Sequence, residues 1–185
     1  MKRVTVLISG NGSNLQALID AQSSIYSIIK VISNKPSAYG LVRAEKANIA
    51  TSIVIKRKEQ TREEYDALLA NEIGETDLVV CAGFMRILTD VMISKFLIIN
   101  LHPALSFGYI GLHAIQRAYS DFLTQKINYS GVIVHYVSLE VDRGQLIEEA
   151  VVPIYPCDSL EMLECRIHTA EHVLIVKAVN KILSV

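Results

Sequence analysis

Residues 4–19 read VTVLISGNGSNLQALI. The apolar run Val4–Ile8 is typical of a buried strand, and the apolar spacing that follows Asn14 predicts a helix. Two glycines, two asparagines and two serines separate the two segments. Small residues at this place let a ligand approach the free amides of a helix start. The stretch therefore predicts a strand–turn–helix unit, and the turn is either a plain structural connection or a site that binds an anion.

The motif GNGSN excludes the best-known nucleotide-binding turns. It lacks the lysine of G-x-x-x-x-G-K-[ST], and Leu15 stands where G-x-G-x-x-G requires its third glycine. A monophosphate fits the remaining features, with Ser13 and Asn14 as candidate contacts. The structural alternative stays open, because glycine permits such a turn with no ligand at all.

The rest of the chain repeats the alternation of strand and helix. Apolar runs occur at 4–9, 25–33, 51–56, 77–83, 96–102 and 130–138, and helical spacing occurs at 14–21, 38–47 and 62–72. This order predicts an α/β, Rossmann-like three-layer fold with a mostly parallel central sheet. Residues 130–154 read as an antiparallel hairpin that turns at EVDRG, and residues 158–183 read as a long final helix that begins in the capping box DSLE.

Length and composition limit the class of protein. The chain has 185 residues, a formal net charge of −1 and three cysteines at unrelated spacings. We expect one domain over residues 1–185, located in the cytoplasm, with reduced thiols and no membrane span. The near-neutral charge argues against nucleic acid as a partner. The five histidines form no ligand-spaced cluster, so no metal is expected.

A second polar cluster follows the apolar run at 96–99. Asn100 and His102 are two residues apart, so in an extended strand both side chains point the same way. An amide and an imidazole together can stabilise a carbonyl oxygen that becomes negative, and the imidazole can carry a proton. If the fold brings Asp142 beside His102, its carboxylate favours the protonated imidazole. The alternatives are a hydrogen-bonded core pair for Asn-x-His and local backbone bonding for Asp142.

Four motifs carry a resemblance that runs almost end to end: VLISGNGSNLQALI, AGFMRIL, INLHPALS and VD-x-G, in this order. Together they resemble the phosphoribosylglycinamide formyltransferases, folate-dependent enzymes of purine biosynthesis. The resemblance implies that 10-formyltetrahydrofolate is the cosubstrate and glycinamide ribonucleotide the acceptor. It implies direct attack of the acceptor amine on the formyl carbon through a tetrahedral intermediate. It also implies small-molecule partners only, no metal, and a monomer or homodimer.

The resemblance assigns site residues by position. Asn100, His102 and Asp142 would be catalytic, with His102 as proton donor. Contacts to the ribonucleotide would come from Gly12, Ser13 and Asn14 at its phosphate, and from His168 and Glu171 in RIHTAEH. His168 stands where a glutamine is expected. The positions that match the folate pocket are Arg62, Met85, Arg86, Ile87, Leu88, Asn100, Ser138, Leu139, Glu140 and Val141.

Some positions depart from the family pattern and keep other functions open. The loop Ala104–Gly111 lacks one serine and two prolines that relatives carry, which predicts a more flexible loop. Arg143 replaces a common glycine after Asp142, and His113 matches a position that is often histidine. The alternatives are formyltetrahydrofolate hydrolase-like activity, methionyl-tRNA formyltransferase activity, or a non-catalytic folate or phosphometabolite binding protein. Chain length disfavours the hydrolase and the tRNA enzyme, because their additional domains do not fit in 185 residues.

Overall fold

The computed structural model describes residues 1–105 and 108–184 of the chain. The strands are β1 (Lys2–Ile8), β2 (Tyr26–Ser33), β3 (Ala50–Ile53), β4 (Leu78–Cys81), β5 (Ile98–His102), β6 (Tyr129–Tyr136) and β7 (Leu146–Pro153). The helices are α1 (Ser13–Asp20), α2 (Tyr39–Lys46), α3 (Arg62–Ile73), α4 (Asp90–Ile93), α5 (Ala114–Leu123) and α6 (Leu160–Leu183). None of the helices in the described ranges is long and apolar enough to cross a membrane.

The seven strands form one sheet in the order β3-β2-β1-β4-β5-β6-β7. Strands β1 to β5 pair in parallel, and β6 and β7 join by antiparallel pairing. Successive strands are added on one side of β1 up to β3 and on the other side from β4 onward, so the strand order reverses between β1 and β4. Open α/β sheets bind ligands at such a point, at the carboxyl ends of their strands. Leu7 pairs with Cys81 and Cys81 with Asn100, so β1, β4 and β5 end at the same edge.

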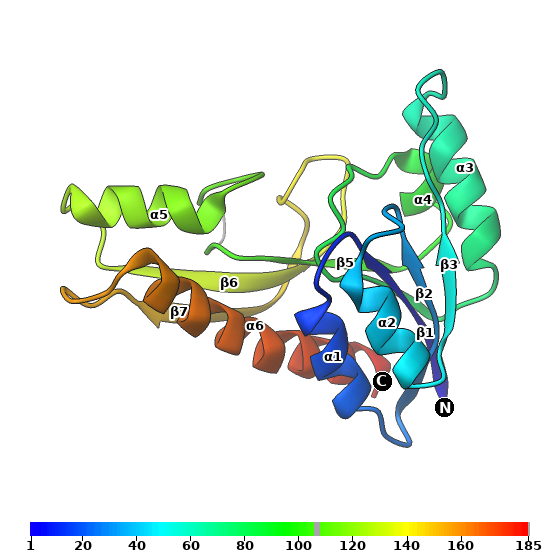
Figure 1. Cartoon of the computed structure of the whole chain (residues 1–185), viewed down its shortest axis with the longest axis horizontal. Helices are drawn as coiled ribbons and strands as arrows, with labels where there is room; N and C mark the ends of the chain where they lie inside the picture. Colours follow the sequence, from blue (N-terminus) through cyan, green and yellow to red (C-terminus); the bar gives the residue numbers. More distant parts are fainter. Residues whose placement is uncertain (106–107, 185) are drawn as a thin grey trace.

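Helices cover both faces of the sheet and give three layers (Figure 1). One buried cluster packs the sheet against α1, α2, α5 and α6, and includes Leu15, Leu41, Ile115 and Ile175. A second cluster packs the other face against α3 and α4. Because both faces are covered, strands such as β4 are buried at every position. The predicted α/β three-layer fold with a mostly parallel sheet is confirmed.

The predicted hairpin at 130–154 is formed by β6 and β7. Its connection depends on Gly144, because a Cβ placed there would lie 1.6 Å from the carbonyl oxygen of Tyr136. In the same turn Asp142 adopts a left-handed backbone with φ of 53°. The turn is thus tightly packed against the end of β6, and this fixes where Asp142 is presented.

The final helix is confirmed, but its capping differs from the prediction by one residue. Ser159, not Asp158, is the N-cap, and its side chain accepts a hydrogen bond from the amide of Met162. Asp158 instead forms two 2.7 Å hydrogen bonds with Arg166 and accepts another from the amide of Tyr155. The reciprocal capping box of this chain is at α3, between Thr61 and Glu64.

Candidate active site

The carboxyl end of β5 and the turn after β6 bring three predicted residues together. His102 Nδ1 lies 3.4 Å from Asp142 Oδ2, and Asn100 Nδ2 donates to Asp142 Oδ1 at 3.3 Å. The side chains of His102 and Asp142 are only 7% and 10% exposed. The strand spacing of Asn100 and His102 therefore presents both side chains to one carboxylate, largely out of water.

His135 is a fourth member of this cluster that sequence reasoning missed. It pairs with Asn100 across the antiparallel β5–β6 ladder. Its Nδ1 lies 2.8 Å from the carbonyl of Tyr136, so Nδ1 carries a proton, and in the neutral ring Nε2 is left to accept from Asn100 Nδ2 at 3.3 Å. The same Nε2 is 3.8 Å from Asp142 Oδ1. The signal in the sequence is a histidine within an apolar strand, but its use depends on the pairing register.

Burial and charge act in opposite directions on His102. Burial lowers the pKa of His102 below its ordinary value, and the nearby Asp142 carboxylate and the Tyr109 carbonyl only partly restore it. Asp142 thus raises the pKa of His102, as the sequence leads us to expect, but burial outweighs this contribution and the net shift is downward. For Asp142, burial raises the pKa, but His135, the Gly111 amide and His102 together outweigh burial, so that the pKa is lowered. Asp142 is thus the stable anion of the pair.

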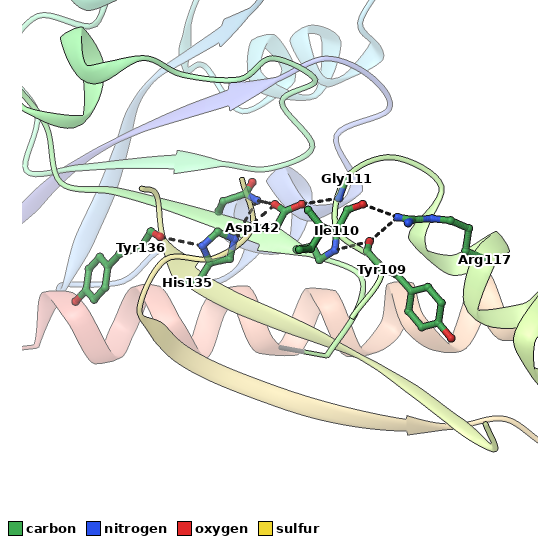
Figure 2. Close-up of polar contacts among 9 residues, drawn as sticks. Tyr109, Ile110, Gly111, Arg117, His135, Tyr136 and Asp142 are labelled. Atoms are coloured by element: carbon green, nitrogen blue, oxygen red, sulfur yellow. Dashed lines mark hydrogen bonds and ion pairs between the residues drawn. The ribbon is translucent and has the colours of Figure 1, made fainter. Parts of the chain in front are cut away.

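Loop residues after β5 contact this cluster. His102 Nε2 lies 3.2 Å from the carbonyl oxygen of Tyr109. The Gly111 amide donates to Asp142 Oδ2 at 2.9 Å (Figure 2). Arg117 on α5 donates to the carbonyls of Tyr109 and Ile110 at 2.5 and 2.7 Å. Loop backbone thus occupies hydrogen-bonding positions that a substrate would need. Ser106 and Phe107, within the loop Ala104–Gly111, lie outside the described residues.

A cavity of about 550 Å³ opens beside the cluster and collects most of the predicted folate residues. Its lining includes Asn100, His102, His135 and Asp142, together with Arg62, Met85, Arg86, Ile87, Leu88, Ser138 and Val141. Leu139 lines an adjoining groove that shares Arg62 with the cavity. Glu140 is exposed and lines neither of these two hollows. The loop that carries Met85 is held by its amide, which donates to Ser9 Oγ at 2.7 Å.

The phosphate candidates are at the end of β1. Gly12 is the N-cap of α1 in a left-handed conformation, and a Cβ there would lie 2.7 Å from the Cα of Gly40. Arg43 on α2 stabilises the turn, because it donates hydrogen bonds to the backbone and side-chain oxygens of Asn11, each at 2.9 Å. Glycine is therefore required by both the backbone angle and the close approach of α2, as the motif GNGSN suggests. Ser13 and Asn14 form the first turn of α1.

The structure joins Asn14 to both predicted residues of the last helix. Glu171 Oε2 accepts from Asn14 Nδ2 at 3.0 Å, and it lies 3.0 Å from His168 Nδ1. Glu171 is buried, whereas the side chain of His168 is half exposed. This second cluster does not line the cavity beside His102. The two clusters lie beside the carboxyl ends of β1 and β5, which are at the same edge of the sheet. Because these strands are two positions apart in the sheet order, their ends are separated by about 10 Å.

Three other features of the sequence take simple places in the structure. Cys81 is buried on β4 at the cavity wall, and burial raises the pKa of its thiol to about 12, which leaves it an unreactive thiol. Arg143 is half exposed and lies 4.0 Å from Glu140. His113 is the N-cap of α5 and lines the cavity. Within residues 1–105 and 108–184, no group of three or more His, Cys, Asp or Glu gathers as metal ligands do.

Known proteins share both the sequence and the fold. Residues 2–179 match the family model described as formyl transferase. The phosphoribosylglycinamide formyltransferase of Dictyostelium discoideum is 46% identical over 197 residues, with 96% of each chain covered. The enzyme of the same name from Schizosaccharomyces pombe is 45% identical over 202 residues, with 98% of this chain and 97% of the relative covered. The crystal structure of glycinamide ribonucleotide transformylase 1 from Symbiobacterium toebii matches with a TM-score of 0.92 at 34% identity, over 100% of this chain and 88% of that one. The family match over residues 2–179 and the similarities in sequence and fold lead to one conclusion: the chain belongs to the formyl transferase family.

Proposed function

We propose that this protein transfers the formyl group of 10-formyltetrahydrofolate to the amine of glycinamide ribonucleotide, a step of purine biosynthesis. The observation that carries the proposal is the meeting of Asn100, His102 and Asp142 on the wall of the 550 Å³ cavity. The phosphate turn on the same edge of the sheet supports a phosphorylated acceptor. The names of the similar proteins support the transfer of a formyl group and the ribonucleotide as its acceptor.

The proposed chemistry needs no covalent enzyme intermediate. The acceptor nitrogen forms a bond with the formyl carbon, the carbonyl oxygen becomes negative, and the bond to N10 of the folate then breaks. Over the whole reaction one proton moves from the acceptor amine to N10. A single group that gains and returns one proton therefore suffices, and in this proposal His102, whose pKa is lowered by burial, takes the proton from the acceptor amine and returns it to N10.

The hydrogen-bonding groups of Asn100 and His102 at the cavity wall have partners within the protein, and they must leave these partners before they can bind the substrate. Asn100 directs its amide toward Asp142 and His135, and His102 Nε2 faces the carbonyl of Tyr109. We infer that the formyl oxygen replaces the Tyr109 carbonyl as the hydrogen-bond partner of His102. It also accepts a hydrogen bond from the side-chain amide of Asn100. After His102 has taken up the amine proton, its imidazolium and the Asn100 amide both donate hydrogen bonds to the oxyanion and stabilise it.

Binding of the two substrates divides between the two clusters. In the proposal Gly12, Ser13 and Asn14 hold the phosphate through helix-start amides and small side chains. The folate pterin lies against the loop 83–88, and Arg62 at the cavity rim pairs with the carboxylates of the glutamate tail. This leaves the acceptor amine and the formyl carbon to meet at the end of β5.

A substrate-consumption assay tests the proposal. The purified protein is incubated with 10-formyltetrahydrofolate, with and without glycinamide ribonucleotide, in a buffer that contains a chelator, and both tetrahydrofolate and formate are measured. Tetrahydrofolate that appears only with the ribonucleotide, together with a formylated ribonucleotide, is the expected result. Formate release that is the same with and without the ribonucleotide would identify a hydrolase. Binding of both ligands without turnover would identify a binding protein.

A further inference from the structure

The buried carboxylate of Glu171 lies next to the turn proposed to hold a phosphate. Glu171 is 4% exposed, and its side-chain hydrogen bonds within the described residues involve Asn14 and His168. Asn14 is neutral, and none of the ion pairs found among those residues joins Glu171 to a lysine or arginine. A buried anion needs a cation or several hydrogen bonds. His168 is the side chain that can provide the cation.

Asn14 points to a ligand at this place by a second observation. The residue is 9% exposed, and its Oδ1 has no hydrogen-bond partner within the described part of the chain. Its Nδ2 is already used by Glu171. An orphaned acceptor at the first turn of α1 is matched by a ligand that brings a donor, such as a ribose hydroxyl, along with its phosphate.

His168 is placed to respond to pH. The charged groups whose fields act on the ring are Glu171 and Glu164, both on α6. The neighbouring helices contribute neutral amides: Asn14 from α1, and Gln116 from α5, which donates to Glu164 at 2.8 Å. The hydrogen bond to Glu171 raises the pKa of His168 above its ordinary value, although partial burial opposes the rise.

We propose that the protonated imidazole of His168 neutralises Glu171 beside the phosphate turn, and that ribonucleotide binding therefore weakens as this imidazole loses its proton. The inference rests on the proposed function, because it assigns the ribonucleotide to this cluster. When His168 is neutral, it no longer offsets the charge of Glu171, and the carboxylate repels a phosphate bound at the adjacent turn. A glutamine, which the resemblance leads us to expect at position 168, would not produce this effect, because it cannot change its charge.

Calorimetric titration with glycinamide ribonucleotide between pH 6.5 and 9 tests the inference, in the absence of folate. For the unaltered protein we expect the dissociation constant to rise about threefold to tenfold over this range, as one charge-assisted contact is lost. His168→Gln should bind weakly at every pH with little slope. His168→Lys should bind tightly with little slope, because its charge persists to pH 9. Thr169→Ala, next to His168 on the exposed helix face, should retain the slope of the unaltered protein.

The substrate's own phosphate ionises near pH 6, and its dianion acts in the opposite direction. This contribution is the same in all four proteins, so it cancels in the comparison. If His168→Gln keeps the slope of the unaltered protein, the inference is wrong while the proposed function stands. If the unaltered protein binds no ribonucleotide at any pH, the proposed function itself fails. In steady-state assays the effect should appear in KM for the ribonucleotide, with kcat changed less than about threefold.

Discussion

The imidazole of His102 lies between two acceptors, the carboxylate of Asp142 at Nδ1 and the carbonyl of Tyr109 at Nε2. Two acceptors favour a ring with two protons, whereas burial favours the neutral ring, and burial prevails. The pKa of His102 is therefore lowered by burial, and the carboxylate and the carbonyl limit the size of the shift. A substrate that takes the place of Tyr109 changes one side of the balance, while Asp142 remains on the other.

Replacement of His102 tests its role as the proton carrier. His102→Asn keeps a hydrogen-bond donor of similar size but cannot accept and return a proton. We expect kcat to fall by about a factor of 10² or more, because general acid–base catalysis is lost. Circular dichroism and the urea midpoint should show that the chain still folds. Turnover close to that of the unaltered protein would remove His102 from the chemistry.

Asp142 controls the pH at which His102 changes its charge. Its carboxylate raises the pKa of His102 against the effect of burial. Asp142→Asn removes that charge, so the pKa of His102 should fall further and the inflection of kcat/KM against pH should move to lower pH. The profile is measured with saturating folate and varied ribonucleotide. An inflection that stays in place would show that His102 does not govern it, or that Asp142 does not act on it.

At the scale of elements, the hairpin turn presents Asp142 through the close packing of Gly144 on β6. Gly144→Ala places a Cβ into the Tyr136 carbonyl. We expect a loss of about 2–4 kcal/mol in the free energy of unfolding and a strong loss of turnover, because the turn must move. The matched control is Gly10→Ala, where nothing lies within 4 Å of an added Cβ. Equal urea midpoints for the two variants would contradict this account.

The cover over His102 depends on α5 through Arg117. Arg117→Gln removes the contacts to the carbonyls of Tyr109 and Ile110. The amide of Gly111, which donates to Asp142, should then exchange its hydrogen about ten times faster. Amides of β4 provide the internal reference and should not change. Unaltered exchange at Gly111 would mean that Asp142 alone holds the loop in place.

The elements with strong periodic patterns were predictable from the sequence, and the contacts between distant elements were not. The spacing of Asn100 and His102 correctly indicates a shared face, because a strand repeats every two residues. The place of His135 in the site was not predictable from the sequence. Its position opposite Asn100 depends on the pairing register of β5 and β6, which the sequence of either strand by itself does not determine. Asp158 was misassigned as a cap because its partner Arg166 lies two helical turns away. The contribution of Asp142 to the pKa of His102 has the expected sign, but the larger opposing effect of burial was not predictable, because burial is a property of the whole fold.

At the scale of the molecule, the sheet order places the two proposed binding clusters on one edge of the sheet as separate sites. The turn after β1 serves one cluster, and the ends of β4 and β5 with the β6–β7 turn serve the other. The cavity beside His102 includes no residue of the phosphate turn. Substrates held at separate strand ends can be brought together while each site keeps its own contacts, which is the arrangement that direct transfer between two bound molecules requires.

This separation predicts that changes at the two clusters act independently. Gly12→Ala strains a left-handed backbone and places a Cβ 2.7 Å from Gly40, so KM for the ribonucleotide should rise about tenfold or more, while KM for the folate changes little. Arg62→Ala, at the cavity rim, should raise KM for the folate by about threefold to tenfold through the lost ion pair. In the double variant each KM should change as it does in the corresponding single variant, to within about 0.5 kcal/mol when the ratio is expressed as a free energy, as expected for sites that share no partner. Steady-state kinetics with each substrate varied in turn give both KM values for the unaltered protein, the two single variants and the double variant. A coupling larger than 1 kcal/mol would show that the turn and the cavity form a single site, because the movement of one would then change the contacts of the other.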